Sequence, residues 1–334
     1  MPAPSTSPRN FLDILKSVWW KLDAALDADI IYWSAALGAA DALLSGTTAI
    51  IDHHESPRSI EGSLDQISAA CDMIGIRHIL CYGVTDRWND NGELVTVSPA
   101  TAMTHAAGRG LEENRRYLQS GKPAMVGVHA AFTCGDETLD AACDLAQSFN
   151  VGVHIHVAEG HADIDAGERL ASRAQSNWLL VHAVHLDREL PGTIIHNPRS
   201  NMNNSVGYAS PARWSGPVAL GTDGIGADML EEFRLSFARH KEDDLAASAD
   251  DSWNWLHAGA DLVPDVRNDV VTWNYDHVDD PWRVAFTPGI RCTDVSINNS
   301  PVVTNGQPLH FDIAEIRAKA SEQAIRLFSR LENV

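Results

Sequence analysis

The chain has 334 residues, of which 44% are hydrophobic, so it can bury the core of one large α/β domain or of two ordinary domains. Its formal net charge of −20 and its pI near 5.0 argue against nucleic acid or an anionic membrane as a partner, because both are polyanions. Its five cysteines form no CxxC pair, which excludes a zinc ribbon and does not suggest a disulfide framework. No stretch resembles a signal peptide or a membrane span, so we expect a cytoplasmic protein.

Helices and strands alternate along the first two thirds of the chain. Apolar residues at a spacing of three to four predict a helix over 11–26, and a second helix is expected over 30–44. The expected strands are short apolar runs, each followed by polar residues, over 47–52, 78–82, 124–128, 153–157, 178–182, 193–196 and 217–223. Further helices are expected over 63–74, 107–118, 137–149 and 229–240. Continuous apolar strands in such repeats indicate a parallel sheet that is covered on both faces.

The last third of the chain has a different pattern. A candidate strand over 269–273 precedes a predicted hairpin over 294–303, and these strands are too few to form a core of their own. An amphipathic helix over 312–331 follows, with Asp312 as its cap. The expected division is a barrel over 1–245, a partial β-sandwich with its connecting segment over 246–310, and a C-terminal helix over 311–334.

Polar residues gather where the predicted strands end. They are Asp52, His53, His54, His129, His156, His182, His196 and Asp223. In a (β/α)₈ barrel all of these ends open onto one rim, where active sites lie. Only seven barrel strands are predicted, so a doubly wound open sheet is the alternative, although no glycine-rich phosphate loop supports a nucleotide site.

The fourth predicted strand carries the clearest chemical signal. His154 and His156 alternate with apolar residues and therefore share one face of the strand. Glu159 follows just past the strand end. An imidazole can hold a divalent cation, and a nearby carboxylate can move a proton between water and substrate. A strand histidine is also a common packing residue, and His154 in particular can be one; the later His182 and Asp223 favour a metal site.

Four motifs in this order resemble the amidohydrolase superfamily. They are His156-Val-Ala-Glu159, Leu180-Val-His182-Ala-Val-His185-Leu, His196-Asn-Pro-Arg-Ser-Asn201-Met-Asn203 and Leu220-Gly-Thr-Asp223-Gly. The similarity is to the cytosine-deaminase-like and chlorohydrolase-like branch, and the flanking segments resemble SsnA-type aminohydrolases. The resemblance implies a (β/α)₈ TIM barrel with a remnant of a small β-sandwich. It also implies a metal-dependent hydrolase of non-peptide C–N bonds, acting on a cyclic amidine or an aromatic base.

The resemblance assigns roles to individual residues. His156, His182 and Asp223 are similar to the family's metal ligands, and His182 also to the residue that polarises the substrate. Glu159 resembles the family's proton shuttle. Asp223 resembles the residue that accepts a proton from the attacking water. The implied cofactor is a divalent metal, with zinc preferred and iron as the alternative.

Substrate contacts are expected from the segment after the sixth strand. His196, Asn197 and Arg199 are the candidates, and the substrate is expected to be a small molecule. The alternative for His196 is that it only caps the Asn-Pro loop that follows it.

One family motif has no counterpart at the front of the sequence. The family's first barrel strand ends in His-x-His, which supplies two metal ligands. Either the parent sequence begins further upstream, or a shortened chain holds metal through His156, His182 and Asp223, helped by His53 or His54; three protein ligands and water can suffice for zinc. The alternative function is a metal-free binding protein. The unpaired C-terminal helix also predicts a homodimer.

Overall fold

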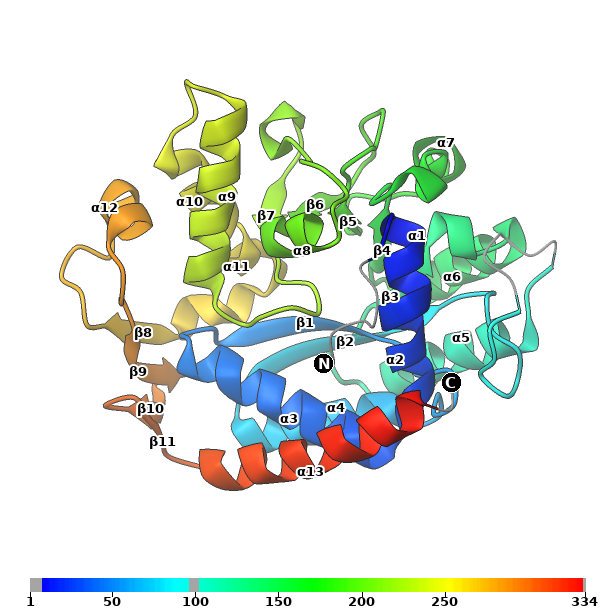
Figure 1. Ribbon diagram of the computed structural model, residues 1–334, viewed down its shortest axis with the longest axis horizontal. Coiled ribbons are helices and arrows are strands. Elements are labelled where there is room, and N and C mark those ends of the chain that lie inside the picture. Colours follow the sequence, from blue (N-terminus) through cyan, green and yellow to red (C-terminus); the bar gives the residue numbers. More distant parts are fainter. Residues whose placement is uncertain (1–7, 96–101, 333–334) are drawn as a thin grey trace.

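Seven parallel strands form a curled sheet at the centre of the molecule (Figure 1). The structure is a computed structural model that describes residues 8–95 and 102–332. The strands are β1 (Ala49–His54), β2 (Arg77–Val84), β3 (Val126–Ala130), β4 (Val153–Val157), β5 (Leu179–His182), β6 (Thr193–His196) and β7 (Val218–Leu220). They lie side by side in chain order, which is the order of a barrel; a doubly wound sheet would reverse its order partway. The predicted barrel-type sheet is therefore confirmed, and in the described residues it is open between β1 and β7.

Helices follow most of the strands and pack against the sheet. The longer ones are α3 (Ala28–Leu44), α4 (Ser63–Ile74), α5 (His105–Gln119), α6 (Asp136–Phe149), α9 (Met229–Asp243) and α10 (Ala249–His257). The short α-helices are α7 (Ala166–Leu170), α8 (Pro198–Asn203), α11 (Gly259–Leu262) and α12 (Pro281–Phe286). Single 3₁₀ turns cover Ala131–Thr133, His161–Asp163, Pro211–Arg213 and Pro264–Asn268. The predicted helices of the barrel are all present, with ends shifted by a few residues.

Side chains along β4 point alternately into the main hydrophobic core and into the interior of the barrel. Val153, Ile155 and Val157 are fully buried in the main core, together with Leu139 and Ala142 of α6. The intervening histidines therefore face the other way, into the barrel. This arrangement places imidazoles, and not apolar side chains, on the inner wall at this strand.

The C-terminal strands form a small antiparallel sheet that shares the main core. They are β8 (Val270–Trp273), β9 (Cys292–Ile297), β10 (Ser300–Thr304) and β11 (Gln307–Pro308). Val295, Val302 and Val303 belong to the same buried cluster as the barrel helices. Arg77 of β2 pairs with Asp269 at 2.8 Å, just before β8. These strands, which are too few to form a core of their own, thus share the core of the barrel.

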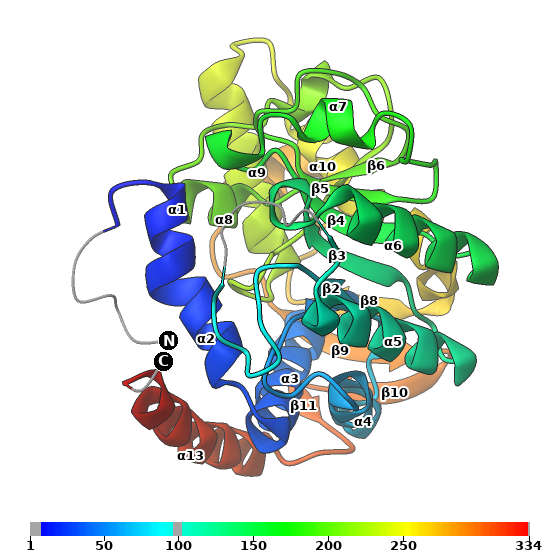
Figure 2. The same cartoon turned by 90° about the vertical axis from the view of Figure 1, so that its right-hand side faces the viewer.

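A bent rod of helix lies over the carboxyl ends of the barrel strands (Figure 2). It consists of α1 (Phe11–Ile14), a π-helical segment (Leu15–Trp19) and α2 (Trp20–Ala25). Leu15 and Trp20 pack with Ala130 and Phe132, which lie at the end of β3 and just after it. The predicted helix over 11–26 is therefore present, and a π-helical turn at its centre is common near functional sites.

The last helix, α13 (Ile313–Leu331), runs alongside α3 (Figure 1). Asp312 caps it, accepting the N–H groups of Ala314 and Glu315. Arg326 and Arg330 both pair with Asp27, the N-cap of α3.

The five cysteines are all free and buried. No helix among the described residues is long and apolar enough to span a membrane.

Candidate active site and metal centre

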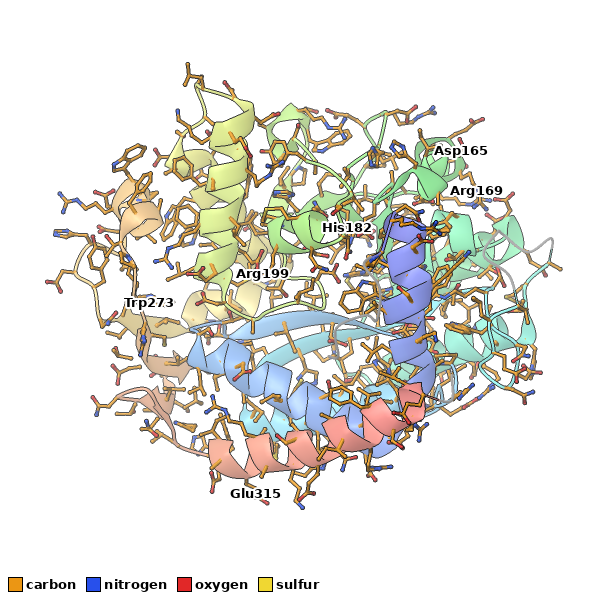
Figure 3. All side chains as sticks on the ribbon, in the orientation of Figure 1. Asp165, Arg169, His182, Arg199, Trp273 and Glu315 are labelled. Carbon is orange, nitrogen blue, oxygen red and sulfur yellow. The ribbon has the colours of Figure 1, made fainter. Side chains whose placement is uncertain are left out.

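Three side chains converge from three different strand ends of the barrel. Glu159 lies just past β4, His182 ends β5 and Asp223 lies just past β7. Nε2 of His182 is 3.4 Å from Oε2 of Glu159 and 3.7 Å from Oδ2 of Asp223. Figure 3 labels His182 among the side chains of this region. We call these three residues the rim cluster; one ligating atom from each lies within 4.8 Å of the others.

The rim cluster has one face open to solvent. The His182 side chain is 1% exposed and that of Glu159 is 11% exposed, whereas that of Asp223 is 28% exposed. A small molecule can therefore reach the cluster from the side of Asp223.

The backbone at the rim cluster is strained. Ala158, His182 and Asp223 have φ angles of 47°, 71° and 54°, and Ala183 has 51°. A side chain in this left-handed region costs on the order of 1–2 kcal/mol per residue, because its Cβ crowds a carbonyl oxygen. Such strain persists only where the surroundings enforce it, and it is concentrated at functional sites. The strain thus points to the same place as the motifs.

Helix α8 holds all three members of the rim cluster. Ser200 donates its hydroxyl to Oδ2 of Asp223 at 2.5 Å. Oδ1 of Asn201 lies 2.8 Å from Nδ1 of His182, and Nδ2 of Asn204 donates to Oε1 of Glu159 at 3.0 Å. The three residues stand at positions i, i+1 and i+4 on or just after one helical turn, so a single short helix orients the entire cluster. These supports were not assigned from the sequence; the run Ser200-Asn201 followed by Asn204, directly after the histidine-ended β6, was the available signal.

The two carboxyl groups of the rim cluster have opposite proton states. Burial, and then the charge of Asp223, raise the pKa of Glu159 to about 8. Burial alone would raise the pKa of Asp223, but His182, His156 and the Ser200 hydroxyl outweigh it and lower that pKa below its ordinary value. Near neutral pH Glu159 therefore holds a proton and Asp223 does not. Two neighbouring carboxyl groups with separated pKa values are the usual basis of an acid–base pair.

His156 lies beside the rim cluster, with its ring centroid 5.5 Å from that of His182. Its Nδ1 is 2.6 Å from the main-chain oxygen of His129, and because a carbonyl can only accept, Nδ1 carries the proton and Nε2 keeps a lone pair. His182 is fixed in the same tautomer by Asn201, which leaves its buried Nε2 without a hydrogen-bond partner. Burial lowers the pKa of both imidazoles, so both are neutral, as metal ligands must be.

These groups fit a divalent cation. The orphaned Nε2 of His182, the Nε2 lone pair of His156 and the ionised carboxylate of Asp223 provide two nitrogens and one oxygen. This is the ligand chemistry of catalytic zinc sites. The sequence predicts these three residues as ligands; the ring centroids of His156 and His182 lie 5.5 Å apart, whereas the group of ligating atoms within 4.8 Å joins His182 and Asp223 with Glu159.

The three expected substrate-binding residues lie around α8. His196 is fully buried; its ring centroid lies 6.0 Å from that of Tyr208 and 6.5 Å from that of Trp255, and neither ring nitrogen has a partner. Asn197 is also buried with both amide atoms unpaired. Arg199 is 35% exposed and is held by Glu232 at 2.6 Å (Figure 3). Among the described residues, no hydrogen bond or ion pair joins any of the three to the rim cluster, so their role in binding stays a prediction.

The helical rod closes one side of the site. A side chain at Gly160, the residue after Glu159, would collide with the ring of Phe11. A Cβ at Gly224, the residue after Asp223, would lie 3.9 Å from the ring of Trp19. Two aromatic rings from the N-terminal rod thus stand next to the two carboxyl-bearing turns.

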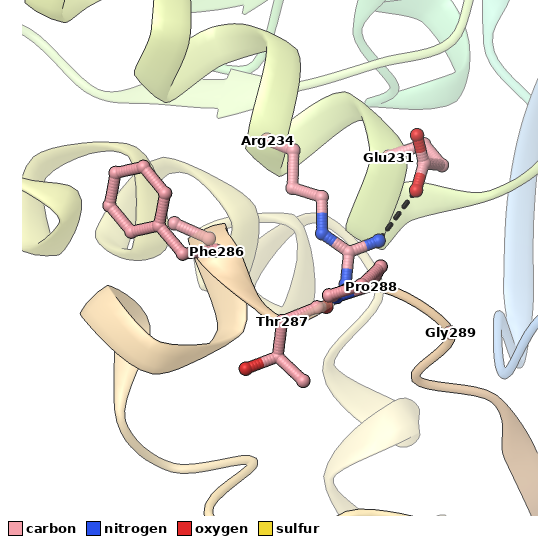
Figure 4. A pocket seen from close by; sticks show the side chains of 7 residues that line it. Glu231, Arg234, Phe286, Thr287, Pro288 and Gly289 are labelled. Atoms are coloured by element: carbon pink, nitrogen blue, oxygen red, sulfur yellow. Dashed lines mark hydrogen bonds and ion pairs between the residues drawn. The ribbon is translucent and has the colours of Figure 1, made fainter.

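A shallow pocket elsewhere is built from α9, the end of α12 and the segment that follows α12 (Figure 4). None of its lining residues belongs to the rim cluster. Arg234 in its wall pairs with Glu231 at 2.5 Å and donates to the main-chain oxygens of Val284 and Thr287. Its guanidinium is therefore occupied by structural partners, and the pocket offers no free charged group from this residue.

Comparison with known proteins identifies the family of the chain. The amidohydrolase family matches residues 5–257. A 5-methylthioadenosine/S-adenosylhomocysteine deaminase of Syntrophomonas wolfei is 27% identical, over 96% of this chain and 81% of that protein. A 5'-deoxyadenosine deaminase of Methanocaldococcus jannaschii is 24% identical, over 93% of this chain and 81% of that protein.

Solved structures show the same fold. An adenosine deaminase from Xanthomonas campestris with bound zinc superposes with a TM-score of 0.79 at 18% identity, covering 97% of this chain and 81% of that one. Atrazine chlorohydrolase TrzN from Arthrobacter aurescens, complexed with zinc, gives 0.78 at 18% identity, covering 96% and 84%. The predicted TIM-barrel type and the predicted class of C–N hydrolase are thereby confirmed, and the chain belongs to the amidohydrolase family.

Proposed function

We propose that the chain is a metal-dependent aminohydrolase that removes the exocyclic amine from an adenine-like ring. The observation that carries this proposal is the rim cluster, in which a protonated Glu159 and an ionised Asp223 face one buried imidazole. An amine on an aromatic ring, next to a ring nitrogen, is the aromatic amidine expected from the motifs. The deaminases of adenine-containing compounds among the relatives support this substrate class.

The ligands of the cation are proposed to be His156, His182 and Asp223, with zinc preferred to iron. A cation bound there would act as a Lewis acid that activates water. The neutral state of both imidazoles and the ionised state of Asp223 mean that no ligand has to lose a proton before binding.

The proton transfers follow from the proton states of the two carboxyl groups. Asp223 takes a proton from the attacking water, while Glu159 gives its proton to the ring nitrogen beside the reacting carbon. As the C–N bond breaks, the new hydroxyl returns a proton to Glu159, and the proton on Asp223 leaves with ammonia. Each carboxyl group ends as it began, which a catalytic cycle requires.

The surroundings of Glu159 fit this role. Asn204 donates to Oε1, so the proton resides on Oε2, the oxygen closer to His182. The flat ring is proposed to lie between this carboxyl group and the aromatic side chains of the N-terminal rod, Phe11 and Trp19. Arg199 is proposed to contact the part of the substrate that lies outside the ring.

We also propose that the protein is located in the cytoplasm and forms a homodimer. Light scattering tests the homodimer.

The test is ammonia release by the zinc-loaded chain from adenosine, 5'-deoxyadenosine, 5'-methylthioadenosine and S-adenosylhomocysteine. Glu159→Gln keeps the shape of the side chain but cannot release and regain a proton, so we expect it to lower kcat by about 10³-fold. Glu112→Gln is the matched control, because Glu112 is 68% exposed and pairs with Arg115 on the surface. Unchanged turnover in Glu159→Gln would refute the assigned role. Binding of these compounds without ammonia release from any of them would favour the metal-free binding protein.

A further inference from the structure

A second group of ligating side chains lies inside the barrel. His53 of β1, Cys81 of β2 and His154 of β4 each place one ligating atom within 4.8 Å of the others. Cys81 is fully buried and His154 is 8% exposed. We call these residues the inner cluster; it shares no residue with the rim cluster.

The inner cluster has lone pairs without partners. Nδ1 of His154 is buried and makes no hydrogen bond. Nε2 of His53 lies 3.2 Å from the main-chain oxygen of Val128, so Nε2 donates and Nδ1 keeps its lone pair. The Cys81 thiol has only a weak contact with the main-chain oxygen of Asp52, at 3.4 Å. Buried polar atoms in folded proteins are normally paired, so the unpaired Nδ1 of His154, close to a thiol, calls for a ligand.

Packing alone does not account for these residues. The rings of His53 and His154 lie 4.8 Å apart at 32° to one another. The ring of His53 occupies the space that a side chain at position 83 would take, and Gly83 on β2 leaves that space free. An apolar side chain would fill this part of the barrel's inner wall with a smaller loss of folding free energy, because it would leave no buried polar atom without a hydrogen bond.

We propose that His53, Cys81 and His154 form a second cation site, which takes Zn²⁺ or another ion that accepts a thiolate. Two imidazoles and one thiolate are a nitrogen–sulfur set, which selects zinc-like ions over Mg²⁺ and Ca²⁺. Three protein ligands leave the fourth tetrahedral position for water. Binding replaces the proton of the Cys81 thiol by the ion, and that proton passes to solvent.

The inner cluster adjoins the rim cluster but differs from it in chemistry. The ring centroids of His53 and His156 are 4.8 Å apart, so a proposed ligand of one site lies directly beside a proposed ligand of the other. The proposed rim ligands contain no sulfur. A spectroscopic signal that requires a thiolate therefore reports on the inner cluster alone.

Co²⁺ titration of the metal-free, reduced chain separates the two sites. The wild type should develop a thiolate-to-cobalt charge-transfer band in the near ultraviolet, besides the weaker visible bands of Co²⁺ bound through nitrogen and oxygen. Cys81→Ser should lose the charge-transfer band and keep the visible bands. Cys134→Ser should keep both, because Cys134 is equally buried and donates in the same way, to the Val84 carbonyl at 3.3 Å, but lies in no such cluster in the described part of the chain.

Two further variants test whether the charge-transfer band comes from the inner cluster. His154→Gln should move the charge-transfer titration to higher Co²⁺ concentration. If circular dichroism shows that Cys81→Ser is unfolded, this shift replaces the loss of the band as the test of the second site. Asp223→Asn should leave the charge-transfer band in place. A wild type without the band, or a charge-transfer titration that neither Cys81→Ser nor His154→Gln changes, overturns the second site and leaves the proposed deaminase function unaffected.

Discussion

The rim cluster and the inner cluster both consist of metal-ligating side chains, but the two sets are held in different ways. Each member of the rim cluster is oriented by a hydrogen bond from α8, and two of its members sit on left-handed backbone. The inner cluster lies on regular strands, and the hydrogen bonds of His53 and Cys81 go to the main-chain oxygens of Val128 and Asp52. The comparison teaches that ligating residues alone do not define a catalytic site. A second layer that fixes proton positions distinguishes the rim cluster, as it does in metalloenzymes generally.

Breaking the rim cluster should have the largest effect. Asp223→Asn removes the only ionised carboxylate of the cluster while it keeps the side-chain size. We expect the loss of the rim-bound metal, measured by elemental mass spectrometry, and a decrease of at least about 10³-fold in ammonia release. Asp187→Asn, at a side chain that is 58% exposed on the surface, should change neither quantity. Full metal content and full activity in Asp223→Asn would contradict the assigned ligand set.

The fold could be predicted largely from apolar periodicity. The seven strands and their barrel helices appear near the expected residues, because buried parallel strands leave a continuous apolar signal. The π-helical segment at Leu15–Trp19 was not predicted, since a wider turn leaves the apolar stripe almost unchanged. Two strands end two residues later than predicted: β1 ends at His54 and β3 at Ala130. The reason is that hydrogen bonding to a neighbouring strand continues past the last apolar residue.

The candidate site could be predicted only in part. Glu159, His182 and Asp223 were recognisable because each follows an apolar strand in a known motif. The supports on α8 were missed, since serine and asparagine occur in any loop and their direction depends on the helix that follows Pro198. The inner cluster was missed because Cys81 and His154 resemble ordinary packing residues in a sequence. Their proximity depends on the pairing of β1 with β2 and on the curl of the sheet towards β4.

The turn that carries Glu159 offers a test through pH. Asp163 accepts the N–H groups of Phe132 at 2.8 Å and of Ala158 at 2.7 Å, and so ties the ends of β3 and β4 together. Burial raises the pKa of Asp163 to about 7 despite these hydrogen bonds. The folded state thus binds this proton more tightly than the unfolded chain does. The contribution of Asp163 to the free energy of unfolding is therefore present at low pH and is lost as the pH rises from about 4 to about 7.

Asp163→Asn should remove this dependence. Between pH 5 and pH 7 the free energy of unfolding of the wild type should fall by about 2 kcal/mol more than that of the variant, as measured by urea denaturation at each pH. Asp165→Asn, at an exposed residue of the same segment, should follow the wild type (Figure 3). Parallel curves for the wild type and Asp163→Asn would mean that the carboxyl group at position 163 is ionised throughout this range. The turn after β4 would then be held by a charged carboxylate, whereas the hydrogen bonds of the inner cluster involve uncharged groups.

The smallest expected effect tests whether α8 is what distinguishes the two clusters. Asn204→Ala removes the donor to Oε1 of Glu159 without touching a proposed metal ligand. Loss of such a support should lower kcat by about 10–100-fold. Because the lost hydrogen bond favoured the ionised form, the pKa of Glu159 should rise further, and the alkaline limb of the kcat profile should move to higher pH. Met202→Ala, an exposed position on the same helix, serves as the control. A decrease in kcat with an unmoved pH profile would show that Asn204 only stabilises α8; a moved profile would show that it acts through the proton on Glu159, which is a support that the inner cluster lacks.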